Sequence, residues 1–100
     1  MITIDDIKKW SKPHPMALDK GARQTRIGNS RIELSIVGGG TGLYGDFEKT
    51  FEVAIFDKKT GNFVTRYYSG LSDDIISYMD GEELEKLVNS IIKEDSLVFG

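Results

Sequence analysis

The chain has 100 residues, no cysteine and a formal net charge of −3, with 39% hydrophobic and 29% charged residues. This length and balance indicate one globular domain and exclude a disordered chain or a disulfide framework. The first residues lack the basic and apolar segments of a secretion signal, and no apolar run approaches the ~18 residues of a membrane span. We therefore expect a soluble, cytoplasmic protein that folds as a single domain over residues 1–100.

Charge is distributed unevenly along the chain. Residues 1–31 carry seven Lys and Arg against three Asp, a balance of +4, which leaves −7 for the remaining residues. The two parts can attract each other, or each can bind a different partner.

The first predicted element is a helix of about two turns at the N-terminus. Thr3 and Asp6 have the spacing of a capping box. Apolar residues then recur at helical spacing, namely Ile4, Ile7 and Trp10. Pro13 ends this helix because proline lacks a backbone donor and restricts its predecessor. An ordered but irregular connection is expected from there to Gly21, pinned by Met16 and Leu18.

Residues 22–37 are typical of a β-hairpin. Gly28-Asn29 separates two extended segments, and both residue types accept the positive φ of tight turns. We expect the first strand, 24–27, to be an edge strand because it is short, polar and contains arginine. The second alternates between two faces: Ile32, Leu34 and Ile36 on one, Arg31, Glu33 and Ser35 on the other.

The glycine-rich segment 38–46 predicts a loop, and a strand is expected from about residue 48 to 56, with Phe51, Val53 and Ile55 on one face. Residues 57–62 then predict a turn with Gly61 in the left-handed conformation, followed by a strand at 63–68.

Two registers are open for this second hairpin. A four-residue loop, the form we favour, pairs Ile55 with Val64 and aligns Phe51 with Tyr68. A three-residue loop instead aligns Val53 with Tyr67. In either register both faces of the sheet carry apolar side chains, which predicts a cover on each face.

The C-terminal part holds the clearest helix. After a polar break at 69–74, the apolar run 75–79 predicts a short strand. Asp80 and Glu83 then have the spacing of a capping box, and one apolar stripe follows, formed by Leu84, Leu87, Val88, Ile91 and Ile92. The tail Leu97-Val98-Phe99 is apolar enough to dock on the domain or to extend a sheet edge.

These elements predict an α+β fold: an antiparallel sheet of four to five strands packed against a C-terminal helix, with a short N-terminal helix. Burial of the five apolar side chains of the C-terminal stripe would stabilise the fold by on the order of 10 kcal/mol, before the loss of conformational entropy on folding is subtracted.

The segment Gly40-Thr41-Gly42-Leu43-Tyr44-Gly45 matches the string G-x-G-x-x-G. The dinucleotide fingerprint requires a helix after this loop, whereas a strand is predicted here. The kinase loop lies between strands, but the chain has no room for a catalytic loop and metal-binding carboxylates. We interpret the segment as a flexible connection, with an anion contact through its backbone donors as the alternative.

No catalytic, metal or cofactor site is predicted. His14 is the single histidine, and no serine or carboxylate is tied to it by spacing. Three carboxylate pairs lie at or near predicted helix starts, where capping explains them: Asp5/Asp6, Asp73/Asp74 and Glu82/Glu83. An enzyme using His14 or the glycine loop is the least favoured hypothesis.

The basic N-terminal segment is the best candidate for binding nucleic acid. Its cations could follow a phosphate backbone and Trp10 could stack on a base; the residues are Lys8, Lys9, Lys12, Arg23 and Arg26. Against this, Trp10 shares a helical face with Ile4 and Ile7, which favours a place in the core. The pI near 5.1 is also unlike that of a typical nucleic-acid binder.

The leading hypothesis is a non-enzymatic interaction or accessory protein that acts through a sheet face or edge, with a homodimer as one form. Arg66, Tyr67 and Tyr68 together with Tyr44 have the composition of a protein interface patch, although we favour packing in the core and on the strand surface for these residues. The small, cysteine-free chain would suit an accessory protein of a phage or mobile element. The partner protein itself is not indicated by the sequence.

Overall fold

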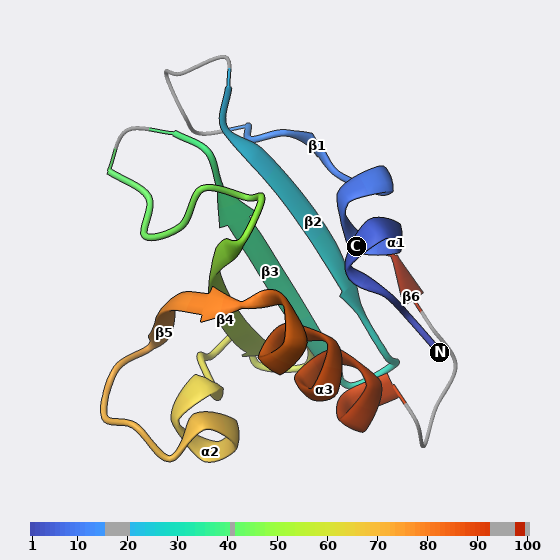
Figure 1. Ribbon diagram of the computed structural model, residues 1–100. Helices are drawn as coiled ribbons and strands as arrows, with labels where there is room; N and C mark the ends of the chain where they lie inside the picture. Colours follow the sequence, from blue (N-terminus) through green and yellow to red (C-terminus); the bar gives the residue numbers. More distant parts are fainter. Residues whose placement is uncertain (16–20, 41, 93–97, 100) are drawn as a thin grey trace.

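The computed structural model describes residues 1–15, 21–40, 42–92 and 98–99 (Figure 1). In chain order the elements are α1 Ile4–Lys9, β1 Lys12–Pro13, β2 Arg23–Gly28, β3 Ile32–Gly38, β4 Thr50–Asp57, α2 Thr65–Ser69, β5 Ile75–Asp80, α3 Gly81–Ile92 and β6 Val98–Phe99. The strands form one antiparallel sheet in the order β1-β2-β3-β4-β5, and β6 also pairs with β2. The predicted α+β fold class is confirmed.

Helix α1 begins as the sequence predicts. The Thr3 hydroxyl accepts a hydrogen bond from the Asp6 backbone N–H at 3.2 Å, and the Asp6 carboxylate accepts one from the Thr3 N–H at 3.0 Å. The helix ends at Lys9, and Pro13 lies in β1 beyond it. Ile7 is fully buried, so α1 contributes directly to the core. Met16 and Leu18, the expected pins of the connection, lie outside the described residues.

The first hairpin is confirmed, with Asn29 at its turn. The Asn29 side-chain oxygen accepts from the N–H groups of Arg31 and Ile32, and its amide nitrogen donates to the Ile91 carbonyl at the end of α3. On β3, Leu34 and Ile36 are completely buried on the face expected to be apolar, but Glu33 and Val37 on the other face are buried as well. One buried asparagine therefore fixes the turn and joins it to the C-terminal helix.

The prediction that the first strand is an edge was wrong. Segments from the two ends of the chain pair with the outer side of β2: β1 pairs at Arg23 and Gln24, and β6 pairs at Ile27 and Gly28. The arginines do not prevent this pairing because Arg23 turns to Ser11, donating to its hydroxyl and carbonyl oxygens. The predicted extension of a sheet edge by the tail is confirmed for Val98 and Phe99, while Leu97 lies outside the described residues.

The predicted strand at 63–68 was also wrong. The favoured four-residue register is seen only at its start, where Phe63 bridges to Phe56 and the Val64 N–H donates to the Ile55 carbonyl at 2.7 Å. The chain then leaves the sheet as helix α2, which ends at Gly70 in the left-handed conformation, φ 72°. Thr65 ends the ladder, because its hydroxyl accepts from the Ile55 N–H at 2.9 Å. Strand β5 takes the place beside β4.

The C-terminal helix covers one face of the sheet (Figure 1). Asp80 caps α3 by accepting from the Glu83 N–H at 2.8 Å. The apolar stripe enters the core as predicted: Leu84, Val88 and Ile91 are buried, and Leu87 and Ile92 pack against them. The strand predicted at 75–79 is confirmed as β5.

The opposite face of the sheet is mixed rather than uniformly apolar: Val37, Ala54 and Phe56 lie on it among polar side chains, and no helix covers it in the described part of the chain. Cross-strand hydrogen bonds join Gln24 to Ser35 and Arg26 to Glu33 on this face. The expected apolar cluster is missing because residues 65–69 form a helix and their tyrosines do not join the sheet. Most of the exposed large apolar side chains instead belong to β5, to α2 and to segments next to them.

Candidate interaction surfaces

Strand β5 contains a bulge that aims Tyr78 away from the sheet. Phe51 pairs with Met79 and Val53 with Ile76, so two residues of β5 oppose one residue of β4. Tyr78 adopts a φ of 53°, a left-handed conformation that a residue with a side chain adopts at a cost of ~1–2 kcal/mol. Its side chain is 62% exposed. Backbone strain therefore holds an aromatic ring at the surface.

Tyr78 meets Tyr44 from the glycine-rich loop. The two rings contact edge to face with centroids 5.9 Å apart, and the Tyr78 N–H donates to the Tyr44 carbonyl at 2.9 Å. The Tyr44 N–H in turn donates to the Glu52 carboxylate at 3.1 Å. These bonds hold both rings at the C-terminal end of β5.

Helix α2 presents a second pair of tyrosines. The Tyr67 and Tyr68 rings contact edge to face with centroids 5.2 Å apart, and Tyr67 is 85% exposed. The helix is anchored by Thr65, which is fully buried and donates to the Asp74 carbonyl at 2.6 Å. Arg66 forms an ion pair with Asp74 at 3.2 Å. The tyrosines are thus held on a short, firmly attached helix.

The structure divides the predicted patch into two parts. Arg66, Tyr67 and Tyr68 lie together on α2, whereas Tyr44 pairs with Tyr78 at the other end of β5 (Figure 1). Sequence reasoning missed Tyr78 and the exposed Leu71. Tyr78 lies in an apolar run that reads as a half-buried strand, and the bulge that exposes it has no local sequence signal. We call five residues the edge surface: Tyr44, Tyr67, Tyr68, Leu71 and Tyr78.

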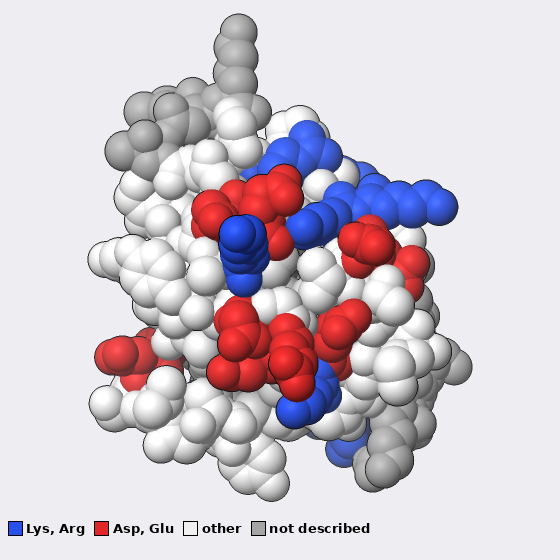
Figure 2. Space-filling view, in the orientation of Figure 1, with Lys and Arg blue, Asp and Glu red and all other residues white. Residues whose placement is uncertain are grey.

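Acidic side chains adjoin the edge surface. Asp73 and Asp74 precede β5, Asp80 ends it, and Glu82 and Glu83 follow in the first turn of α3. On the helix-covered face, Figure 2 shows acidic side chains grouped across the middle and a group of basic side chains toward the upper right, where α1 and β1 lie. The unequal charge along the sequence is therefore also unequal in space.

The cations proposed for nucleic acid are largely engaged with this chain. Lys8 pairs with Glu48 at 3.3 Å, Arg23 bonds Ser11, and Arg26 pairs with Glu33. Lys9 and Lys12 are exposed at the surface. Trp10 is half-buried and packs against the core, as its helical spacing predicted. Nothing in this arrangement favours the N-terminal segment as a nucleic-acid site.

The glycine-rich loop is shaped by close packing. A Cβ atom at Gly45 would lie 2.8 Å from the backbone of Phe51, and one at Gly38 would lie 2.8 Å from the Phe47 nitrogen. The Gly39 N–H donates within the loop to the Gly45 carbonyl at 3.0 Å. Two glycines therefore allow the loop to lie against the start of β4, and several of its backbone donors, those of Gly39, Leu43, Tyr44 and Asp46, are already used.

The described part of the chain contains neither a cluster of metal-ligating side chains nor a membrane-spanning helix. No group of three or more His, Asp or Glu side chains there could hold a metal ion. Among the same residues, no helix is long and apolar enough to cross a membrane. The His14 backbone N–H donates to the Ala22 carbonyl, which attaches this histidine to the start of β2.

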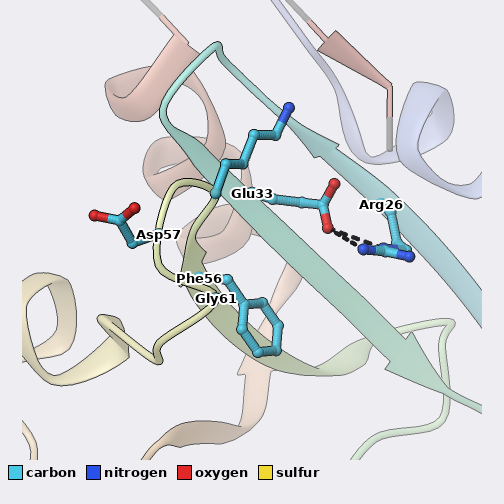
Figure 3. A pocket seen from close by; sticks show the side chains of 6 residues that line it. Arg26, Glu33, Phe56, Asp57 and Gly61 are labelled. Atoms are coloured by element: carbon cyan, nitrogen blue, oxygen red, sulfur yellow. Dashed lines mark hydrogen bonds and ion pairs between the residues drawn. The ribbon is translucent and has the colours of Figure 1, made fainter.

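A hollow lies on the polar face of the sheet, where the 29–31 and 57–62 turns meet (Figure 3). It measures about 510 Å³ and is lined by Arg26, Glu33, Phe56, Asp57, Lys58 and Gly61. The Lys58 N–H donates to the Arg31 carbonyl at 2.9 Å, which holds the two turns side by side. In the close view α3 lies behind the sheet, so the hollow opens on the face opposite the helices. We call this site the open-face hollow.

Comparisons with protein families, with curated proteins and with solved structures find no match for this chain. Its function is therefore inferred from the surfaces described above.

Proposed function

We propose that the protein is a non-enzymatic interaction protein that binds a partner protein through the edge surface. One observation carries this proposal. Among the described residues, seven large hydrophobic side chains are exposed, and five of them belong to the edge surface. Tyrosine is enriched at protein interfaces because it combines a large apolar area with a polar group at low entropic cost.

The backbone of β5 supports the same interpretation. No strand pairs with its outer side in the described part of the chain, so an added strand could pair there. The Tyr78 N–H is the exception, because it already donates to the Tyr44 carbonyl. The strain at Tyr78 is also easier to understand at a binding surface than in a region that serves only stability. Backbone donors and exposed rings would then act together on one partner.

Charge indicates what kind of partner suits this edge. In a symmetric antiparallel pairing of β5 with a second copy of itself, centred at Ser77, Asp74 would oppose Asp80 of the other copy at both ends. Like charges directly opposite each other destabilise a strand pair. A different protein with basic residues beside the added strand is therefore the partner that we favour. A homodimer built through the tyrosines of α2 is the second form of the proposal.

Photo-crosslinking in cells of the native host tests this proposal. A benzophenone amino acid replaces Tyr67 in one variant and Tyr78 in another, and the matched control carries it at Ser90, an exposed position on α3. We expect a discrete adduct with one protein from both edge positions and none from Ser90. Equal adducts from all three positions, or none from the edge, would contradict the proposal.

Light scattering coupled to size exclusion distinguishes the two forms of the proposal. If the edge adduct contains a second copy of this chain, the protein should have a dimer mass that Tyr67→Ala lowers to the monomer mass. A monomer at all concentrations together with an adduct to a different protein would remove the homodimer form.

A further inference from the structure

The carboxylate of Glu33 is the unusual feature of the open-face hollow. Its side chain is 91% buried, since only 9% of it is exposed. Arg26 donates to a single oxygen of this carboxylate, Oε1, through both Nε and one terminal nitrogen. In Figure 3 the second oxygen points away from Arg26. No side-chain oxygen or nitrogen in the described part of the chain is both buried and without a partner, so no desolvation penalty attaches to this second oxygen. It lines the open-face hollow, where it can accept from a ligand that brings a donor.

Aromatic rings lie beside this carboxylate. Phe56 is the register partner of Glu33 on β4, and its ring packs on that of Phe63 with centroids 4.6 Å apart and planes tilted by 37°. Phe56 lines the open-face hollow, whereas Phe63 lies beside it, outside the lining of both hollows, and is 48% exposed. The pair therefore forms a partly open platform for a planar group next to a hydrogen-bond acceptor.

A second hollow of about 400 Å³ adjoins the first. It is lined by Ser30, Arg31, Asp57, Lys58 and Lys59, so the two hollows share Asp57 and Lys58. Each volume falls within the ~300–1,000 Å³ of small-ligand sites. A ligand with two chemically different parts could place one part in each hollow.

This end of the molecule is positively charged. Across the two hollows four cations, Arg26, Arg31, Lys58 and Lys59, face two carboxylates, a local balance of +2 in a chain of −3. Both carboxylates already have partners. Glu33 pairs with Arg26, and one oxygen of Asp57 accepts from the N–H groups of Lys59 and Thr60.

We propose that the two adjoining hollows bind single-stranded nucleic acid, with a base on the Phe56 and Phe63 rings, its amino group on Glu33, and its phosphate beside Lys58 and Lys59. Stacking of bases on aromatic side chains next to basic residues is the common basis of single-strand binding. Glutamate accepts from the exocyclic amine of cytosine or adenine, which thymine and uracil lack. Both hollows are open, which suits a strand that passes over the surface.

Fluorescence anisotropy of the full chain with labelled single-stranded homopolymers of C, A and T tests this site. We expect C and A strands to bind more tightly than T strands. Phe63→Ala should weaken binding about 5-fold to 100-fold, the typical effect of losing one stacking ring. The double variant Lys58→Gln/Lys59→Gln should also lower the slope of log affinity against log salt by about 1.4.

Two further variants keep the result interpretable. Lys9→Gln/Lys12→Gln removes two exposed cations of the N-terminal segment and should leave the affinity unchanged. Glu33→Gln should reduce the preference for C and A over T, and its thermal unfolding curve shows whether the fold is retained. Because Phe63 is half exposed, Phe63→Ala tests the site even if Glu33→Gln does not fold.

Four outcomes would overturn the inference. They are the absence of binding, an unchanged affinity in Phe63→Ala, loss of binding in Lys9→Gln/Lys12→Gln, and competition by inorganic polyphosphate as strong as that by the oligonucleotide. The last result would mean that charge alone attracts the strand. Equal competition by free cytidine monophosphate, compared at the same nucleotide concentration, would identify a mononucleotide as the ligand and overturn the assignment to a strand.

Discussion

The central strands β2, β3 and β4 have two outer edges, and the chain completes them differently. At β2, β1 and β6 add short strands from opposite ends of the sequence. At β4, β5 pairs with the first half and the Phe63 bridge followed by α2 occupies the second. The β2 edge ends in two-residue strands, whereas the β4 edge ends in a six-residue strand with exposed tyrosines.

The difference shows how one sheet can protect one edge and display the other. Very short outer strands offer little backbone to another chain, which is a common way to block sheet extension. Strand β5 is longer, but its bulge and the ring of Tyr78 restrict which partner can add to it. The β2 edge therefore serves stability, and the β4 edge is the one we propose for binding.

The largest expected effect comes from detaching α2 from the β4 edge. Thr65→Val removes the hydroxyl that serves the Ile55 N–H and the Asp74 carbonyl, and it leaves both groups without this partner. We expect a loss of about 2–4 kcal/mol in the free energy of unfolding, measured with urea. Thr65→Ser retains the hydroxyl and should lose about 1 kcal/mol. Equal losses in the two variants would show that the hydroxyl does not anchor the helix.

The matched change at the β2 edge should cost less. Thr25 is buried and donates to the Ile7 carbonyl of α1 at 2.6 Å, so its hydroxyl serves one backbone group rather than two. We expect Thr25→Val to lose about 1 kcal/mol in the same urea titration. If Thr25→Val lost more free energy of unfolding than Thr65→Val, the β2 edge rather than the β4 edge would depend more on its threonine hydroxyl.

The strain at Tyr78 predicts an unusual order of stability. Glycine adopts positive φ without steric cost, so Tyr78→Gly should be about 1 kcal/mol more stable than Tyr78→Ala. At the neighbouring Ser77, which has no positive φ, alanine should be the more stable replacement. If the alanine variant is more stable than the glycine variant at both positions, the backbone at Tyr78 is not strained.

The smallest expected effect is on the stability of the fold at acid pH. It compares Asp46, just before β4, with Asp6 in α1. The N–H groups of Thr50, Glu48 and Lys49 donate to Asp46 and hold its pKa well below the usual range, and the Thr3 N–H lowers the pKa of Asp6 in α1. A lowered pKa stabilises the fold above the unfolded value of about 4, and this contribution is lost as the pH falls below it.

Asp46→Asn should therefore flatten the decline in the urea midpoint between about pH 4 and pH 2. Asp6→Asn should flatten it less, because one backbone donor rather than three holds that carboxylate. The difference between each variant and the unmodified protein should shrink as the pH falls, because the stabilisation by the ionised aspartate is progressively lost below its unfolded pKa. Parallel curves across the whole range would contradict this assignment.

Local patterns were sufficient for about half of the fold. The capping residues Thr3 and Asp80, the turn at Asn29 and the apolar stripe of α3 each act within a few residues, so their structural roles follow from spacing. The segment 63–68 was misassigned because its valine and tyrosines have strand propensity, which depends strongly on context. The hydroxyl of Thr65 can end the ladder only because Ile55 and Asp74 meet it in space.

The candidate surfaces were predictable only in part. Tyr67 and Tyr68 were candidates for an interface patch because they adjoin Arg66, and both are exposed. Tyr78 was not a candidate, because the bulge between β4 and β5 decides its direction. The open-face hollow joins Glu33 of β3, Phe56 of β4 and Lys58 of the following turn, and no spacing rule places these residues together.

The sequence by itself determined the helices, the first hairpin and the face of β3 that is buried, because periodicity, capping and turn chemistry act locally. Only the tertiary structure decided which segments complete the two edges. Backbone donors and acceptors of β2 and β4 can pair with any extended segment that reaches them, and which segment reaches them depends on how the whole chain packs.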